Sequence, residues 1–279
     1  MRFPTGLRSL LDHGLIDEVV RPLMSGKEAQ VYLVVSGGEH RVAKVYKEAT
    51  HRSFKHRASY TEGRKSRNSR DQRAMAKRTR HGKAQEEAAW RSAEVDTIYR
   101  LQDAGVRVPT PYHFVDGVLV MELVQNEDGS PAPRLGEVHV GAERAHVIFD
   151  QLISEVVKML CAGIVHGDLS DFNVLLDANG PVVIDFPQSI DAARNQSARE
   201  ILIRDVNNLN QFLLGYGPTK RPLQHAAEMW AMYEKGELLP DTKLTGIYKA
   251  SKARVDLQGL LKELEDDEAD EMRRRAAES

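Results

Sequence analysis

The sequence lacks several features that would assign it to common protein classes. Its 279 residues include a single cysteine, Cys161, so no disulfide can form within the chain, which suits a reducing compartment. No uninterrupted apolar stretch approaches the roughly 20 residues that span a bilayer, and residues 1–6 lack the apolar region of a signal peptide. The formal net charge is -2, which gives no global reason to expect nucleic acid or membrane as a partner. We therefore expect a soluble, cytoplasmic protein that binds no membrane.

The most informative stretch that the sequence does contain lies between positions 165 and 185. Asp168 is followed five positions later by Asn173, and Asp185 ends a short apolar run that predicts a strand. A carboxylate, a carboxamide and a second carboxylate at this spacing suit a divalent metal and a hydroxyl nucleophile. The stretch therefore indicates a phosphotransferase site.

The N-terminal part of the chain predicts an antiparallel sheet. Residues 5–20 have helical spacing, and residues 21–35 and 41–46 follow as three strands with polar turns between them. The turn Ser25-Gly26-Lys27 offers backbone N–H groups and a cation to a phosphate chain, although a plain hairpin turn explains it about as well. Lys44 lies inside the third strand, where a lysine either extends to solvent or pairs with another group.

Residues 51–83 differ in composition from the rest of the chain. Twelve lysines and arginines stand in this segment against two acidic residues, Glu62 and Asp71, and apolar residues are few. Such a stretch cannot bury enough surface to order itself, so we expect a solvated, flexible loop. Its charge suits the phosphates of RNA or of another polyanionic partner, while its sparse aromatic residues argue against sequence-specific readout.

Beyond this segment, residues 84–104 predict a helix that carries Glu94. Glu94 is either an exposed helix residue or the buried partner of Lys44. Strands are predicted around residues 112–115 and 118–123, where Asp116-Gly117 forms the turn.

The connection 125–133, which contains one glycine and two prolines, predicts a hinge between two lobes. Helical spacing then returns from about residue 141, and again over residues 198–214 and 224–235. We therefore expect an N-terminal lobe over residues 1–124, a C-terminal catalytic lobe over residues 125–250, and a charged helix or tail over residues 251–279.

Four segments together resemble the core of a protein kinase. They are the turn and strand at 25–32, the basic insertion 51–83 between Lys44 and Glu94, residues 166–173, and residues 184–189 where ordinary kinases carry Asp-Phe-Gly. The resemblance is closest to the RIO family of atypical protein kinases, and it covers about residues 20–215. Only some twenty residues precede the phosphate loop, so the likeness is greatest to the family's first branch, which lacks an N-terminal winged helix.

The resemblance implies a two-lobed, protein-kinase-like α+β fold, with an antiparallel sheet in the N-terminal lobe and a mainly helical C-terminal lobe. It implies an ATP-dependent serine/threonine protein kinase that uses Mg²⁺ or Mn²⁺, acts on a protein substrate and phosphorylates itself. Lys44 would hold the inner phosphates and pair with Glu94. Asp168 would accept or orient the proton of the nucleophile, and Asn173 and Asp185 would hold the metal.

The resemblance also implies a nucleotide pocket between the lobes. Its expected contacts are Ser25, Gly26 and Lys27 with the phosphates, Val31, Ala43 and Met121 with the adenine, and the backbone of Glu122 and Val124 with the adenine edge.

Two other functions compete with this reading. In the RIO family the residue at Asp185 is also suspected of accepting phosphate, which would make the protein an ATPase-type ribosome-assembly switch that binds rRNA or a ribosomal precursor through residues 51–83. Small-molecule phosphotransferases similar to aminoglycoside or choline kinases share the His-Gly-Asp and Ile-Asp signatures at 166–168 and 184–185. The phosphate loop and the basic insertion favour the RIO reading over them.

Overall fold

A computed structural model describes residues 4–26, 29–47 and 93–248 of the chain. By its internal contacts the chain divides into Met1–Ile247 and Tyr248–Ser279, and the first of these units is described below. The predictions made for Lys27, for the basic segment 51–83 and for the tail 251–279 lie outside the described residues. In the described ranges, no helix is long and apolar enough to cross a membrane.

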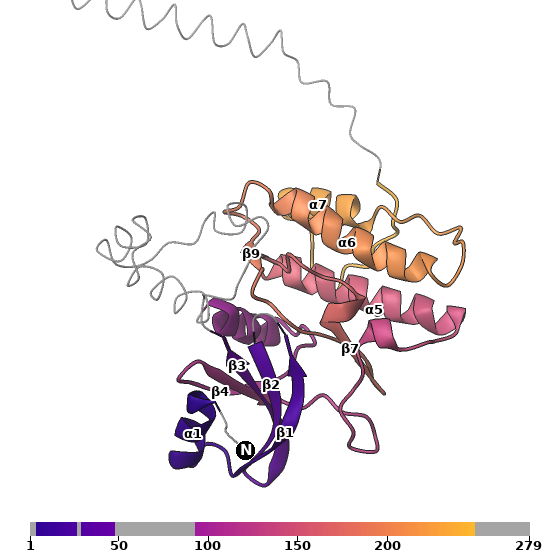
Figure 1. Cartoon of the computed structure of the whole chain (residues 1–279). Coiled ribbons are helices and arrows are strands. Elements are labelled where there is room, and N and C mark those ends of the chain that lie inside the picture. The colour runs from indigo at the N-terminus through magenta and orange to yellow at the C-terminus, as the bar shows by residue number, and fades with distance from the viewer. Residues whose placement is uncertain (1–3, 27–28, 48–92, 249–279) are drawn as a thin grey trace, which may run out of the picture. The chain divides into compact units, whose positions relative to one another are not determined.

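An antiparallel five-stranded sheet forms the N-terminal part of this unit, in the order β1-β2-β3-β5-β4 (Figure 1). Its strands are β1 Glu18–Ser25, β2 Ala29–Ser36, β3 Glu39–Tyr46, β4 Pro111–Val115 and β5 Val118–Glu122. The first three confirm the predicted sheet at the start of the chain. Strand β3 is central, so both of its edges are paired and its side chains alternate between two covered faces.

The helix α1, Thr5–Asp12, covers one face of this sheet. Its Leu7 and Leu10 are fully buried in a cluster that includes Val34 of β2 and Val120 of β5. The helix is shorter than predicted, and residues 18–20 belong to β1 instead. The chain reverses at Gly14, whose φ of 66° favours glycine, and then enters the sheet.

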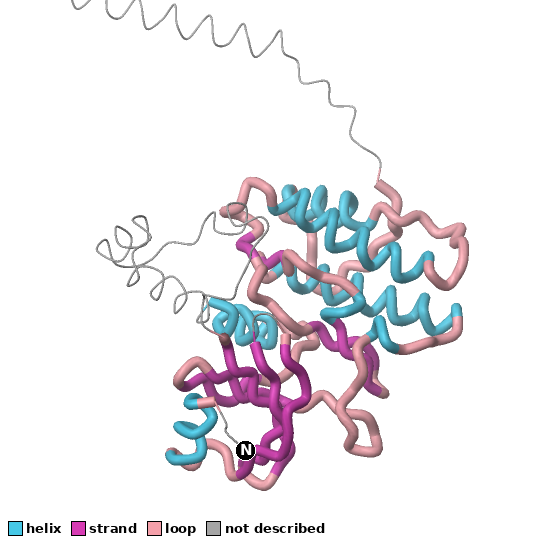
Figure 2. Tube along the Cα trace, viewed as in Figure 1, coloured by secondary structure: helices cyan, strands magenta, loops and turns pink. Residues whose placement is uncertain are grey.

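The C-terminal part is mainly helical, as predicted (Figure 2). Its helices are α5 Ala142–Cys161, α6 Ala198–Leu214 and α7 His225–Glu234, and residues 93–103 are helical within the range predicted for the Glu94 helix. Short elements between α5 and α6 are β6 Ile164–Val165, η3 Asp171–Asn173, β7 Val174–Asp177, β8 Gly180–Val183 and β9 Ile190–Asp191, and η2 Leu135–Glu137 precedes α5. The boundary between the lobes at residue 124 stays a prediction.

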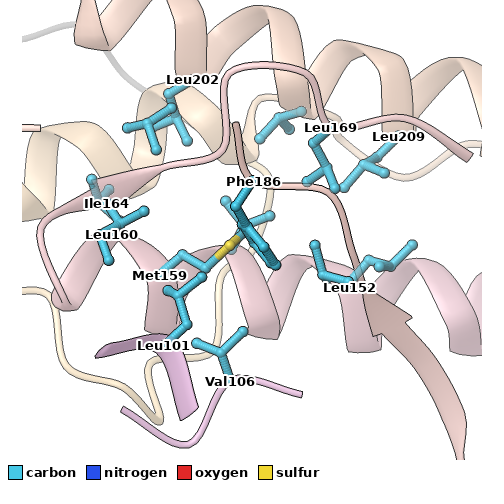
Figure 3. Close-up of a cluster of buried hydrophobic side chains, with 14 of the residues drawn as sticks. Leu101, Val106, Leu152, Met159, Leu160, Ile164, Leu169, Phe186, Leu202 and Leu209 are labelled. Carbon is cyan, nitrogen blue, oxygen red and sulfur yellow. The ribbon is translucent and has the colours of Figure 1, made fainter. Parts of the chain in front are cut away.

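One hydrophobic cluster spans both parts of the unit. Phe186, which is 1% exposed, lies at its centre close to Met159 of α5 (Figure 3). Leu101 of the helix at 93–103 and Leu119 of β5 enter the same cluster. This shared core fixes the Glu94 helix and the residues around Asp185 relative to the sheet.

Candidate active site

Lys44 joins three elements of the fold at one point. It lies on β3 opposite Val31 of β2 and Leu119 of β5, on the face of the sheet away from α1. Its Nζ donates to Glu94 Oε1 at 2.7 Å and to Asp185 Oδ1 at 2.6 Å. Glu94 is only 2% exposed, so the prediction that it pairs with Lys44 is confirmed and its reading as a surface residue is wrong.

The charge of Lys44 is stabilised in this position. Burial acts to lower the pKa of Lys44, but the negative charges of Asp185 and Glu94 outweigh it and raise the pKa well above its usual value. The lysine is therefore a permanent cation. It carries a positive charge to the point where Asp185 begins the loop that follows β8.

Asp185 adopts a backbone conformation that non-glycine residues seldom take, with φ of 71°. Burial acts to raise the pKa of its carboxyl group, but the ammonium of Lys44 and its hydrogen bond lower it, and the net pKa lies below the ordinary value. The group is ionised at neutral pH, and one of its oxygens is engaged by Lys44. Such local strain persists where the surrounding structure enforces it, which is common at functional sites.

Asp168 and Asn173 lie on the loop between β6 and β7, and the structure brings them together. The amide Nδ2 of Asn173 donates to the Asp168 carbonyl oxygen at 2.8 Å and to Asp168 Oδ2 at 3.3 Å. This fixes the rotamer of Asn173 so that its Oδ1 remains for another ligand. Burial and the nearby charge of Asp185 raise the pKa of Asp168, as expected of two carboxylates that face one site.

His166 links this loop to the residue before Asp185. Its Nδ1 accepts the Asp168 N–H at 3.2 Å, and its Nε2 lies 3.1 Å from the Ile184 carbonyl oxygen, so the neutral tautomer with Nε2–H satisfies both contacts. Burial lowers the pKa of His166 to about 4. The ring lies 5.0 Å from that of Phe186, which connects the loop to the core.

Asp205 of α6 is a site residue that the sequence reasoning missed. Its carboxylate accepts the N–H of Gly167 at 2.7 Å and the N–H of Leu169 at 3.3 Å, on either side of Asp168. Arg204 donates to the Gly167 carbonyl oxygen. An acid on the buried face of an apolar helix was the available signal, because Asp205 shares that face with Leu202 and Leu209.

The turn after β1 is described only at Ser25 and Gly26. The Gly26 N–H donates to the Ala29 carbonyl oxygen at 2.9 Å, which closes the turn. Lys47, directly after β3, donates to Ser25 Oγ at 3.4 Å and to the Gly26 carbonyl oxygen at 2.5 Å. The sequence reasoning did not single out this lysine, which brings a cation to the expected phosphate loop.

Two of the three side chains expected at the adenine lie on the face of Lys44, and one does not. Val31 and Met121 lie on the Lys44 face of the sheet, where they pack with Leu33, Val42 and Leu123. Ala43 points to the opposite face and is fully buried in the cluster against α1, so it cannot line the slot. Side chains alternate along a strand, so the residue that shares the face of Lys44 is Val42.

The backbone of the connection between the two parts presents the N–H of Val124. Glu122 N–H donates to the Thr110 carbonyl oxygen at 2.8 Å, and the Val124 carbonyl oxygen accepts the Ala132 N–H at 2.9 Å. The Val124 N–H donates to no group in the part of the chain that the structure describes. It is therefore open to a ligand that packs between Val31 and Met121.

The side-chain oxygens of Asp185 and Asn173 fit a hard divalent cation that a phosphate ligand also coordinates. Among the residues described, no cluster of three or more His, Cys, Asp or Glu side chains could hold a metal alone. One carboxylate and one carboxamide oxygen, from Asp185 and Asn173, match the few protein ligands that Mg²⁺ takes when phosphate oxygens complete its shell.

Known proteins resemble this chain over most of its length. The sequence model of the family described as RIO domain matches residues 30–226, so Ser25 and Gly26 lie outside the match. The RIO-type serine/threonine-protein kinase Rio1 of Haloferax volcanii is 35% identical over 209 residues, which cover 75% of this chain and 67% of that protein. The human serine/threonine-protein kinase RIO1 is 30% identical over 246 residues, which cover 86% of this chain but only 39% of that protein.

A solved structure shares the fold. The Rio2 kinase of Chaetomium thermophilum, in a structure described as an ADP/Mg²⁺–phosphoaspartate complex, matches 86% of this chain and 67% of its own, with a TM-score of 0.57. The two sequences are 19% identical. The likeness supports the protein-kinase-like fold.

Proposed function

This chain belongs to the RIO family of serine/threonine protein kinases, and on that premise we propose how its residues bind ATP and transfer the γ-phosphate. It is an enzyme that phosphorylates serine or threonine hydroxyl groups of proteins at the expense of ATP with Mg²⁺. One observation carries the assignment of roles. The ammonium of Lys44 contacts Glu94 and Asp185 together, so a lysine of the sheet and a carboxylate of the helical part face the same space.

In this arrangement the chain's own residues position and neutralise the phosphates. Lys44 holds the inner phosphates, and Glu94 holds Lys44. The turn at Ser25 and Gly26, with Lys27 and Lys47, contacts the phosphate chain. Val31, Val42 and Met121 enclose the adenine, while the Val124 N–H and the Glu122 carbonyl oxygen bind its edge.

Asp168 and the metal ligands act on the reacting atoms. Asp168 orients the acceptor hydroxyl and takes up its proton as the oxygen attacks the γ-phosphorus, and the bond from phosphorus to the leaving ADP oxygen breaks. Its raised pKa brings the carboxylate closer to the strength that a general base needs. Asn173 Oδ1 and Asp185 would hold Mg²⁺, which would neutralise phosphate charge; Mn²⁺ is the alternative ion.

The ionised Asp185 supports a second reaction of the same site. Its carboxylate is oriented by Lys44 through one oxygen, which leaves the other to attack the γ-phosphorus in place of the acceptor hydroxyl. ADP would leave, and water would then hydrolyse the acyl phosphate to restore the carboxylate. The Chaetomium Rio2 structure is described as a phosphoaspartate complex, which favours including this ATPase-type switch.

Labelled-ATP turnover, with and without a protein acceptor, tests these roles. We expect Asp168→Ala to reduce transfer to hydroxyl groups by about 10²- to 10⁴-fold, the usual contribution of a general base. Asp185→Asn should abolish both transfer and hydrolysis. Asp96→Asn removes an exposed carboxylate from the Glu94 helix and serves as the control that keeps full activity.

The chemical stability of the labelled products separates the two reactions. Phosphoserine survives acid, whereas an acyl phosphate on Asp185 is lost in base and with hydroxylamine. Transfer to protein that persists unchanged in Asp168→Ala would show that the proposed role of Asp168 is wrong.

The acceptor and the partners extend the proposal. The curated relatives are named protein kinases, which favours a protein acceptor over an aminoglycoside or choline. The charge of residues 51–83 supports binding to rRNA or a ribosomal precursor, with autophosphorylation at the serines there. Such binding would weaken steeply with salt, and its absence at low salt would refute it. The reducing compartment indicated by the single cysteine supports a cytoplasmic location.

A further inference from the structure

Arg134 extends from the helical part of the chain to the first strand of the sheet. Its backbone forms a bridge with Leu175 of β7, and its N–H donates to Glu137 Oε2 of η2 at 3.3 Å. Its side chain reaches β1, where Nη2 donates to Met24 Sδ at 3.0 Å. Met24 comes directly before Ser25, at the expected phosphate loop. The guanidinium therefore lies beside that loop on a rigid support.

The guanidinium of Arg134 has no anionic partner among the described residues. A thioether sulfur is a weak acceptor, and Nε is shielded from solvent without any hydrogen bond. In the described ranges no carboxylate forms an ion pair with it, whereas Arg107 and Arg221 each pair with an aspartate at 2.5 Å. A half-buried guanidinium has lost part of its hydration, and an anion bound to it would offset the free-energy cost of that loss.

The register of the sheet shows which side of the site this charge faces. Met24 of β1 pairs with Val31 of β2, and Val31 pairs with Lys44 of β3, so the three side chains share one face of the sheet. Arg134 therefore contacts the sheet at a residue of the Lys44 face, directly before the phosphate turn. The phosphates of a nucleotide held by Lys44 would extend along this face.

We propose that Arg134 binds the phosphate chain of the nucleotide, exchanging the sulfur of Met24 for phosphate oxygens when the nucleotide enters. This inference rests on the proposed function, in which ATP occupies the site. The planar fork of arginine matches phosphate oxygens in two parallel hydrogen bonds, which an ammonium cannot reproduce. Arg134 acts on the phosphates and leaves the adenosine moiety to the slot around Val31 and Met121.

Calorimetric titration with ADP, ATP and adenosine, each with Mg²⁺ and again in EDTA, tests the proposal. Replacing Arg134 by methionine keeps the length of the side chain and removes its charge. We expect Arg134→Met to weaken ADP and ATP binding by about tenfold or more, the range of a lost hydrogen bond to a charged group. Adenosine affinity should not change, and Arg134→Lys should fall between the two. Arg221→Met, a surface arginine paired with Asp150, is the matched control.

Each other outcome has a defined meaning. Equal losses for ADP and adenosine would overturn the proposal, because Arg134 would then only support the fold of the pocket. Unchanged ADP binding with a raised KM for the protein acceptor would overturn it too, since the anion would belong to the acceptor. A wild-type chain that binds neither ADP nor adenosine would refute the proposed function itself. If Arg134→Met does not fold, the ADP-to-adenosine comparison in Arg134→Lys decides.

Discussion

The loop that carries Asp168 is held by two residues whose pKa values are shifted in opposite directions. Burial raises the pKa of Asp205 to about 7, although its hydrogen bonds from Gly167 and Leu169 act to lower it. Burial lowers the pKa of His166 to about 4, so the ring is neutral at physiological pH. The backbone on both sides of Asp168 therefore depends on two groups that titrate differently in the folded and unfolded chain.

For Asp205 we predict a stability component that decreases as pH rises. The folded protein keeps this proton up to a pH of about 7, whereas an unfolded aspartate releases it near pH ~4. The folded state thus binds more protons between these values, and its stability falls with rising pH in that window. Relative to Asp205→Asn, the free energy of unfolding should fall by about 1 kcal/mol from pH 6 to pH 7.

Urea unfolding of both proteins at several pH values measures this difference. The subtraction removes His166, whose depressed pKa gives a contribution of opposite sign that is lost as pH falls through about 4. A difference that is flat from pH 6 to pH 8, or that increases, would contradict the protonation state assigned to Asp205.

Single residues differed in how far the sequence could predict them. Lys44, Asp168, Asn173 and Asp185 could be proposed as site residues because charged or amide groups beside apolar runs are conspicuous in the sequence. Asp205 was missed because its partners lie 38 and 36 positions away, and no local pattern links a helix residue to that loop. Val42 could have been found, since strand alternation alone puts it on the face of Lys44.

At the scale of elements, the helix at 93–103 matters through one buried carboxylate. Ile98 and Leu101 anchor it in the shared core, and Glu94 then meets Lys44 across 2.7 Å. We predict that Glu94→Gln lowers kcat/KM by at least about tenfold, equivalent to ~1.4 kcal/mol, because Lys44 loses a charged partner and leans to Asp185.

Steady-state kinetics and thermal unfolding of the same variant check this prediction. Asp96→Asn removes the same charge from the exposed side of the helix and should leave both quantities close to wild type. A similar fall in kcat/KM in both variants would show that the helix charge matters, and the Lys44 contact does not.

Elements were predicted well where periodicity is long and poorly where it is short. Helix α6 was predicted over its observed range, Ala198–Leu214, because its apolar residues repeat through several turns. The boundary between α1 and β1 was misplaced, because residues 15–20 carry apolar side chains that suit either period. Burial of Val19 in the cluster against α1 decides for the strand.

For the whole molecule, we expect burial in the shared core to decide how much each phenylalanine beside the site contributes to stability. Phe186 is fully buried at the residue after Asp185, whereas Phe172, the residue before Asn173, is 58% exposed. We predict that Phe186→Ala lowers the free energy of unfolding by about 3–5 kcal/mol, the cost of a large cavity in a packed core. Phe172→Ala should change it by about 0.5 kcal/mol or less.

Denaturant unfolding of the two variants, followed by near-ultraviolet circular dichroism, measures the contrast. If Phe172→Ala were the more destabilising change, the loop that holds Asn173 would contribute more to the core than its exposure indicates. The two phenylalanines flank the same site, so each serves as the control for the other.

The whole fold was predictable only through the resemblance. Lys44 and Asp185 are separated by 141 positions, and helical or strand periodicity cannot bring such residues together. The four segments that resemble a RIO kinase did so, because they implied a known arrangement of two lobes.

The pair of Lys44 and Glu94 joins the central strand of the sheet to a helix whose Ile98 and Leu101 lie in the shared core. A kinase whose control depends on swinging this helix keeps the two groups apart until a signal arrives. Because the core anchors this helix, we expect control here to act on entry and departure: which acceptor reaches Asp168, and how long the spent nucleotide stays. We therefore expect inhibitors and regulatory partners of this protein to act by occupying the site, and mutations that rotate the Glu94 helix to lower activity without creating a switch.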